Sequence, residues 1–173
     1  IQVQQGILVN DRLQTNFPFI YAGGDVAQGP DLSTGRQAIH AIQPTSVDHG
    51  RVAGANMAGE TVRYPGSLLM NVLDVAGLHC SSFGLWQDDE REALVLQNPN
   101  RPIYRKVVWE DDRIVGAVLY GDVSDGAWFF DMIKRGTDVS DMRDTVIFGQ
   151  NYAGGTPLDP MAAVAALPDD GEI

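Results

Sequence analysis

The sequence predicts two successive units: an α/β block over residues 1–59 and a small α+β domain over residues 60–149, in which helices back an antiparallel sheet. Three observations support this. The first block holds short strand-like runs followed by a long helical pattern. Residues 60–66 (ETVRYPG) are mostly polar and contain proline and glycine, as expected of a joint between domains. The second block has several strand-like runs before its helical patterns, an order typical of α+β proteins.

Within the first block, apolar and polar residues alternate over residues 1–9, as in short half-buried strands. Residues 17–22 (FPFIYA) are mostly apolar and predict a strand that runs directly into a glycine pair and an aspartate. Residues 28–35 are rich in turn-forming residues and predict a loop. A helix is expected over residues 44–58, because Pro44 suits a first helical turn and the glycine after the segment suits its end.

The second block contains five runs of strand-forming residues and two helical patterns. The strands are expected at residues 67–75, 78–86, 93–96, 104–109 and 114–120, and the helices at 127–136 and 138–148. The polar residues 110–113 (EDDR) between the last two strands indicate a β-hairpin loop. This order of elements predicts the antiparallel sheet with its helices.

Composition and charge limit the class of protein. With 44% hydrophobic and 20% charged residues, the chain of 173 residues is expected to form a globular core. The net charge of −11 argues against a nucleic-acid partner, because nucleic-acid phosphates would repel it. No run of about 18 apolar residues occurs, so no association with a membrane through a spanning helix is expected.

The start of the chain and its cysteine content bear on location. Residues 1–10 lack a basic segment followed by an apolar one, so no signal peptide is visible. The one cysteine, Cys80, excludes an internal disulfide and fits a reducing compartment, which favours the cytoplasm. The chain has no initiating Met and opens within a strand-like pattern, so we expect it to be a piece of a larger protein.

Residues 15–26 (TNFPFIYAGGDV) carry the strongest chemical signal. An apolar strand followed by glycines aims a turn at whatever lies beyond the carboxyl end of the strand, and glycine lets another group approach the backbone closely. In such a turn the carboxylate of Asp25 can accept hydrogen bonds from ligand hydroxyls. The pattern alone leaves two interpretations open: a ligand-binding turn, or a tight turn capped by Asp25 without a ligand.

This stretch resembles the second FAD motif of the flavoprotein reductases with two dinucleotide-binding domains, and residues 6–11 (GILVND) match the strand segment before that motif. The resemblance implies that Asp25 binds a ribityl hydroxyl of FAD, with Gly24 and Val26 beside the flavin chain. In that family the glycine-rich turn that holds the FAD pyrophosphate, and the NAD(P)H domain, lie upstream and outside this chain. FAD is therefore expected in the parent protein, and its binding by this chain alone is in doubt.

Residues 44–50 (PTSVDHG) resemble the next helix of the same family, whose N-terminus faces the pyrimidine edge of the flavin ring. A physical argument supports this independently, because a helix N-terminus offers N–H groups without partners and about half a positive charge. We therefore expect Pro44, Thr45 and Ser46 at the flavin, with the backbone of Thr45 and Ser46 as candidate donors. The alternative interpretation is a capped surface helix without a ligand.

The second block resembles the C-terminal domain of NADH:rubredoxin-reductase-like proteins and of the large subunit of NAD(P)H-dependent assimilatory nitrite reductase. The matching segments are 73–78 (LDVAGL), 104–108 (YRKVV) and 114–122 (IVGAVLYGD). Segments 158–163 and 167–173 resemble the part that leads into a cysteine-rich iron–sulfur module in the nitrite and nitrate reductase flavoproteins. Residues 150–173 are therefore expected to be a linker toward an iron–sulfur module that this chain does not contain.

The resemblance implies a flavoprotein oxidoreductase that passes electrons from NAD(P)H through FAD to a downstream acceptor, and nitrite reduction to ammonia is the expected reaction. The parent enzyme would then also hold iron–sulfur and siroheme groups. The alternatives are a rubredoxin reductase, the electron-transfer subunit of a nitrate reductase, and a non-catalytic module in which residues 67–149 dock a partner or form a homodimer. No residue of this chain is expected to be catalytic, and the isolated chain is expected to be inactive.

The remaining candidate residues favour structural roles. The three histidines, His40, His49 and His79, are too scattered to indicate a metal site, and His49 is expected at the surface. Cys80 lies in a predicted strand and is expected to be a core or half-buried thiol. The tryptophans are expected in the core or at a domain interface, and they are Trp86, Trp109 and Trp128.

Overall fold

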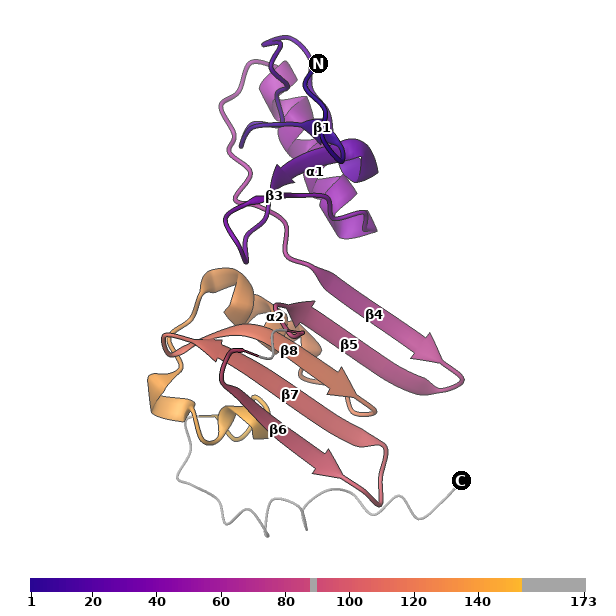
Figure 1. The fold of residues 1–173 in the computed structure, drawn as a ribbon, viewed down its shortest axis with the longest axis vertical. Helices are drawn as coiled ribbons and strands as arrows, with labels where there is room; N and C mark the ends of the chain where they lie inside the picture. The colour runs from indigo at the N-terminus through magenta and orange to yellow at the C-terminus, as the bar shows by residue number, and fades with distance from the viewer. Residues whose placement is uncertain (88–89, 154–173) are drawn as a thin grey trace. The chain divides into compact units, whose positions relative to one another are not determined.

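The computed structural model describes residues 1–87 and 90–153. It divides the chain into two compact units, of which unit 1 comprises Ile1–Leu69 and unit 2 begins at Met70 (Figure 1). No helix in the described residues is long and apolar enough to cross a lipid bilayer. The predicted linker at residues 150–173 falls, beyond Ala153, outside the described residues.

Unit 1 combines a small three-stranded sheet with one long helix. Its elements are β1 (Ile7–Leu8), the 3₁₀ helix η1 (Gly24–Val26), β2 (Ala27–Pro30), β3 (Gln37–Ala38) and α1 (Gln43–Met57). The strand order is β1-β2-β3, with β1 parallel and β3 antiparallel to β2. The core draws on every part of the unit, and its buried residues are Val9, Leu13, Ala27, Ala53 and Tyr64.

Helix α1 confirms the helix predicted over residues 44–58. Ile42 before it is extended, and Pro44 stands in the first turn, where the missing N–H removes no helical bond. The buried residues lie three or four positions apart, as on one helix face. They are Thr45, His49, Ala53 and Asn56. Because most of these side chains are polar, α1 is held in place by hydrogen bonds as well as by apolar contacts.

The apolar strand predicted over residues 17–22 is wrong, because this segment forms a β-turn. The amide of Ile20 donates to the carbonyl of Phe17, which places Pro18 at the second position of the turn, where its fixed φ is favourable. The amide of Thr15 then donates to Ile20, and Phe19 at the tip is 93% exposed. Extended backbone before the glycine pair is limited to the bridge of Tyr21 to Gln14 and to Gly23, and the regular strand β2 follows the pair.

Unit 2 confirms the predicted small α+β domain with an antiparallel sheet. The strand order is β4-β5-β8-β7-β6, and every neighbouring pair is antiparallel. The strands are β4 (Met70–Val75), β5 (Leu78–Gly84), β6 (Ala93–Asn98), β7 (Ile103–Glu110) and β8 (Arg113–Tyr120). Asp111 and Asp112 both have positive φ, so the predicted hairpin between β7 and β8 closes with a tight two-residue turn.

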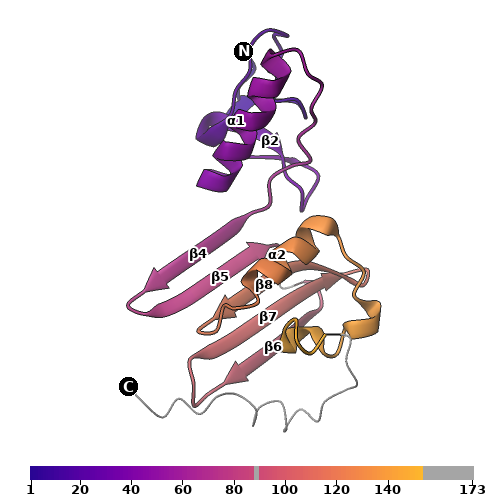
Figure 2. The ribbon, with the colours of Figure 1, turned by 180° about the vertical axis from the view of Figure 1, so that it is seen from behind.

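Helix α2 (Gly126–Arg135) covers one face of this sheet, lying over β8 and β5 (Figure 2). Its apolar residues Phe129, Met132 and Ile133 are buried. They meet sheet residues that point to the same side, among them Val107 and Leu119, which are about 1% exposed. The helix ends at Gly136, whose left-handed conformation is typical of a helix stop.

The second helix predicted over residues 138–148 is wrong, because only two 3₁₀ turns form there. They are η2 (Ser140–Met142) and η3 (Val146–Phe148). The side chain of Asp138 accepts a bond from the Ser140 amide, and the amide of Val139 donates to Asp112 in the β7–β8 turn. Val139 is also fully buried. This tertiary contact fixes the backbone at Val139 and prevents it from continuing as a regular helix.

Residues 60–69, which include the predicted joint at 60–66, pack on unit 1. The side chain of Asn56 donates to the carbonyls of Arg12 (3.1 Å) and Val62 (2.9 Å) and accepts a bond from the Val62 amide (2.9 Å). Asn56 is 8% exposed, so these backbone groups find their partner in a single buried side chain. Tyr64 then continues into the core and its amide donates to Asp11.

Replacing this asparagine should therefore destabilise unit 1. Asn56→Ala leaves buried backbone groups without a partner, and we expect it to lower the free energy of unfolding of unit 1 by about 2–3 kcal/mol. Met57→Ala, at the exposed neighbouring position of the same helix, should change it by less than about 0.5 kcal/mol. Urea titrations followed by NMR amide signals of α1 measure both. Equal effects of the two substitutions would contradict this role of Asn56.

Candidate functional site

The glycine turn, residues 23–26, lies directly against the first turns of α1. It contains η1 and is joined to the helix by the Ser46 hydroxyl, which lies 3.2 Å from Asp25 Oδ1 and 3.3 Å from the Ile42 carbonyl oxygen. Two segments about 20 residues apart in sequence, both predicted as parts of one binding site, thus meet in the fold.

Of the six predicted site residues, three are in mutual contact range and three are placed around them. Gly24, Asp25 and Ser46 form the junction itself. Val26 and Pro44 are exposed beside it, whereas Thr45 is buried, at 4% exposure. A role for Thr45 at a ligand therefore falls to its backbone and not to its side chain.

The glycine pair is required by the closeness of the helix. A Cβ atom at Gly23 would lie 3.1 Å from the His49 Cβ, tighter than almost all such contacts. Gly24 has φ of +73°, a conformation that other residues adopt only with strain, and a Cβ there would lie 3.3 Å from the Ser46 Oγ. The glycines thus allow the turn to pack closely against α1. This packing places Asp25 at the surface.

His49 is not at the surface, contrary to the prediction from sequence. Its side chain lies inside unit 1 at 2% exposure, and its Nδ1 accepts a hydrogen bond of 3.1 Å from the Gly24 amide. The ring meets Tyr64 edge to face, with 4.7 Å between the ring centroids. Burial lowers the pKa of His49 below its ordinary value, so the ring is neutral at neutral pH. Sequence reasoning missed this contact because α1 has no clear apolar stripe that marks its inner face.

The chemistry of the junction suits a ligand that carries hydroxyl groups and an electron-rich edge. Asp25 is exposed, and its carboxylate can accept hydrogen bonds. Among the described residues no side chain caps α1, and Pro44 has no N–H, so the amides of Gln43 and Thr45 are the backbone donors at this end. The expectation that the Ser46 amide is a free donor is wrong, because it donates to the Ile42 carbonyl at 3.1 Å. Helix N-termini favour negative charge. FAD, with its ribityl hydroxyls and pyrimidine oxygen, fits this set of donors and acceptors.

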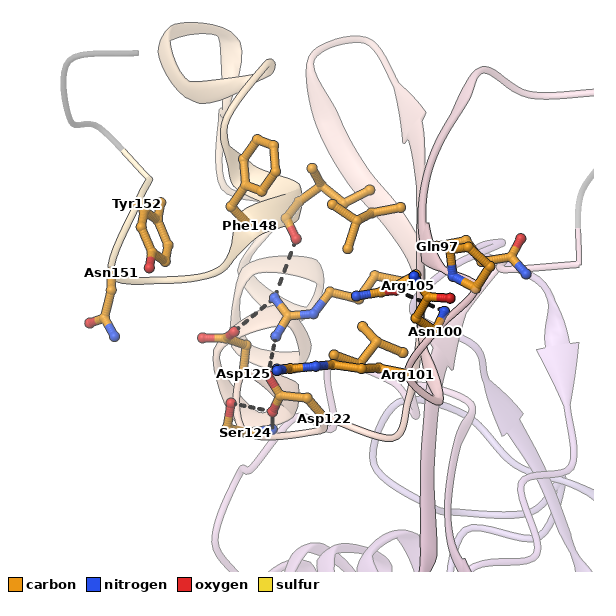
Figure 3. Close-up of a pocket in the computed structure, with 15 residues that line it drawn as sticks. Gln97, Asn100, Arg101, Arg105, Asp122, Ser124, Asp125, Phe148, Asn151 and Tyr152 are labelled. Atoms are coloured by element: carbon orange, nitrogen blue, oxygen red, sulfur yellow. Dashed lines mark hydrogen bonds and ion pairs between the residues drawn. The ribbon is translucent and has the colours of Figure 1, made fainter. Parts of the chain in front are cut away.

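Unit 2 has a separate hollow of about 540 Å³ that the sequence did not predict (Figure 3). It lies between the connection from β6 to β7 and residues 147–152, with Phe148 and Tyr152 on one side. Arg105 forms its floor. The guanidinium is buried, and it contacts Asp122 at 2.7 Å, Asp125 at 3.0 Å and the carbonyl of Ile147 at 3.3 Å.

This arginine joins three parts of unit 2: strand β7, the start of α2 and the turn η3. Burial alone would raise the pKa of Asp122, but hydrogen bonds from Ser124 and the charge of Arg105 outweigh it, so the pKa lies below its usual value. Gly149 completes the cluster, because a Cβ there would collide with the Asp125 carboxylate. Since every hydrogen-bonding partner is supplied by the protein itself, we interpret the cluster as structural. An arginine at an inward position of an apolar strand is the only sequence signal for it.

The remaining histidines are paired locally. His40 is buried and its Nε2 lies 3.2 Å from Asp31, while the exposed His79 lies 3.5 Å from Asp74. In the part of the chain that the structure describes, no group of three His, Cys, Asp or Glu side chains could hold a metal ion. Cys80 is half-buried, as predicted.

Comparisons with known proteins agree with the predicted resemblance. Residues 70–137 match the family model of the rubredoxin NAD+ reductase C-terminal domain. The chain is 34% identical to nitrite reductase [NAD(P)H] of Bacillus subtilis over 173 residues, covering 98% of this chain and 20% of that protein. It is 28% identical to the assimilatory nitrate reductase electron transfer subunit of the same organism, covering 85% of this chain and 18% of that protein.

A solved structure is similar as well. The crystal structure of NADH:rubredoxin oxidoreductase from Clostridium acetobutylicum superposes with a TM-score of 0.63 at 26% identity, covering 82% of this chain and 36% of that one. These matches confirm the resemblance to nitrite reductases and to rubredoxin-reductase-like flavoproteins. The chain spans only about a fifth of the length of the nitrite and nitrate reductase relatives.

The Arg105 cluster yields a stability prediction. Arg105→Met removes the shared partner of two carboxylates, one of them largely buried, and should lower the free energy of unfolding of unit 2 by about 2–3 kcal/mol. Arg135→Met, which breaks an exposed pair with Asp131, should cost less than about 0.5 kcal/mol. All three tryptophans lie in unit 2, so their fluorescence during urea unfolding reports this unit. Similar midpoints for both variants would show that Arg105 does not hold the unit together.

Proposed function

Because residues 70–137 belong to the rubredoxin NAD+ reductase C-terminal domain family, we propose that this chain is the C-terminal part of an FAD-dependent reductase. The parent protein passes electrons from NAD(P)H through FAD to a downstream acceptor. The observation that carries this is the junction of the glycine turn with α1, together with the 34% identity to a nitrite reductase over almost the whole chain. Unit 1 is then the end of the FAD-binding domain, and unit 2 is the small C-terminal domain.

At the flavin, this chain's part is to bind and orient. FAD, when bound, supplies the chemistry of accepting a hydride from NAD(P)H and handing electrons on. Asp25 holds the ribityl chain through its carboxylate, with Gly24 and Val26 beside it. The start of α1, formed by Pro44, Thr45 and Ser46, faces the pyrimidine edge and favours negative charge there. Ser46 also contacts Asp25 directly, because its hydroxyl can donate a hydrogen bond to the Asp25 carboxylate.

The proposed acceptor is nitrite, which the parent enzyme reduces to ammonia by way of iron–sulfur and siroheme groups outside this chain. The nitrite reductase relative supports this choice, because it aligns with 98% of the chain, against 85% for the nitrate reductase subunit. A rubredoxin reductase remains the alternative, favoured by the family of unit 2. Purified full-length protein distinguishes them: nitrite-dependent NAD(P)H oxidation is expected, and oxidation only with rubredoxin would favour the alternative. A cytoplasmic location fits the use of NAD(P)H as the electron donor.

A second candidate function is that unit 2 also docks a partner or forms a homodimer. The observation that favours it is the exposure of apolar side chains on β4, the edge strand of the β4–β5 hairpin (the hairpin is drawn in Figure 1). Val72, Leu73 and Val75 are 56–65% exposed on an edge strand. Val75→Lys should then convert a dimer to a monomer in sedimentation experiments, whereas Val95→Lys on the opposite edge should not. If the wild-type chain sediments as a monomer, the homodimer hypothesis is contradicted.

The flavin role of Asp25 has a direct test in the full-length protein. Asp25→Asn keeps the shape of the side chain but removes the charge that strengthens its bond to a ribityl hydroxyl. We expect about ten- to a hundredfold weaker FAD binding, the loss typical of a charged hydrogen bond. Asp74→Asn, an exposed aspartate of unit 2, should leave the affinity unchanged. Flavin absorbance after gel filtration and titration of the stripped protein measure both, and unchanged binding in Asp25→Asn would contradict the assignment.

A further inference from the structure

We infer that His49 is a positioning residue of the flavin site: its neutral ring holds the glycine turn through the Gly24 amide, and protonation of the ring releases that turn. This inference rests on the proposed role of Asp25 and adds to it the residue, the tautomer and the proton dependence. His49 itself does not touch the flavin in this arrangement. It acts through the backbone of the residue that precedes Asp25.

The hydrogen bond determines the tautomer. A backbone amide can only donate, so Nδ1 of His49 must present its lone pair to Gly24, at 3.1 Å. The neutral ring then carries its proton on Nε2. Within the described residues Nε2 is buried and has no hydrogen-bond partner. A second proton at Nδ1 would set two donors against each other, and the Gly24 amide would lose its acceptor.

The ring has little room to move aside. It is 2% exposed, it packs edge to face on Tyr64, and a Cβ atom built on Gly23 would lie 3.1 Å from the His49 Cβ. The neighbouring turn is less enclosed, because Gly23 and Asp25 on either side of Gly24 are exposed. When the bond is lost, the adjustment therefore falls on the glycine turn, which is at the surface, and with it on the Asp25 carboxylate.

The groups that face His49 favour the neutral ring at neutral pH. Burial is the largest influence and lowers its pKa; the charge of Asp48 opposes this, and His40 adds to it. Tyr64, whose own pKa is raised by burial, stays uncharged. His40 is in turn paired with Asp31. The bond to Gly24 is therefore present at neutral pH and is lost as the pH falls through the lowered pKa of His49.

The same sign applies to stability. The unfolded chain takes up the His49 proton at a higher pH than the folded chain does, so acid favours unfolding of unit 1. The contribution is complete above the ordinary histidine pKa and declines as the pH falls below it. Loss of stability thus begins near the ordinary histidine pKa, and loosening of the turn in the folded chain follows at lower pH, at the lowered pKa of His49.

NMR of the 173-residue chain tests the inference without any flavin. At neutral pH the His49 ring nitrogens should show an unprotonated Nδ1 and a protonated Nε2. The Gly24 amide signal should shift with pH at the pKa of His49 itself. A proton on Nδ1 at neutral pH, or a Gly24 amide that does not follow His49, would overturn the inference, and neither result depends on a variant that has to fold.

Variants then distinguish the role of His49 as a hydrogen-bond acceptor from its role in packing. His49→Asn places a carbonyl oxygen near the position of Nδ1 but cannot gain a proton, so it should keep the Gly24 bond and abolish its pH dependence. His49→Leu has no acceptor, and in the full-length protein it should weaken FAD binding about tenfold at all pH values. His40→Asn, a second buried histidine of unit 1, serves as the control and should retain the titration of Gly24.

The outcomes also distinguish this inference from the proposed function. If His49→Asn loosens FAD as much as His49→Leu does, or if wild-type FAD affinity does not fall with the protonation of His49, the positioning role is refuted while the Asp25 site stands. If Asp25→Asn leaves FAD binding unchanged, the proposed function fails even though the Gly24–His49 bond is confirmed by NMR.

Discussion

The contact between the glycine turn and α1 is the constraint on which unit 1 depends. A peptide of two glycines approaches the helix closely enough for its amide to reach a buried imidazole, and a Cβ atom on either glycine would make a tight contact with the helix. Because His49 holds the Gly24 amide from the inner side, Asp25 points outward and lies within reach of the Ser46 hydroxyl. The glycines that look like a ligand cradle in sequence thus serve first to pack backbone on helix.

In unit 2, the corresponding joint between elements is a buried charged residue. Its sheet, its main helix and the irregular segment after that helix meet at Arg105, which satisfies two carboxylates and a carbonyl at once. In a buried location such a cluster is stable only when each member has its partners. The polar groups of both units therefore act as fixed joints between elements, while the apolar residues supply most of the buried area.

In the proposed flavoprotein, the joint between the glycine turn and α1 would hold the backbone beside the flavin. This chain corresponds to about a fifth of the nitrite and nitrate reductase relatives, so much of the environment of a bound flavin would come from other parts of such a protein. What this chain can contribute is a carboxylate, the start of a helix and the rigidity of the turn between them. An affinity that depends on one exposed side chain is sensitive to how firmly the backbone beneath it is held.

Much of the fold could be predicted from the sequence because it is encoded locally. Helix α1 follows from Pro44 and the glycine at its end, and the five strands of unit 2 follow from β-branched runs separated by turn residues. One error arose from a local turn signal within an apolar run, and the other from a contact between residues distant in sequence. Residues 17–22 bend at Pro18, and Val139 is held by the β7–β8 turn instead of continuing a helix.

The candidate site divides in the same way. The sequence by itself determined that a glycine pair and an aspartate precede a helix with a proline-containing start, and that a separate antiparallel domain follows. Only the tertiary structure decided that Ser46 reaches Asp25, that His49 faces inward to the Gly24 amide, and that Arg105 is buried among carboxylates. The physical reason is that these contacts depend on which face of an element is packed, and a buried face made of polar and small residues leaves no hydrophobic period to mark it.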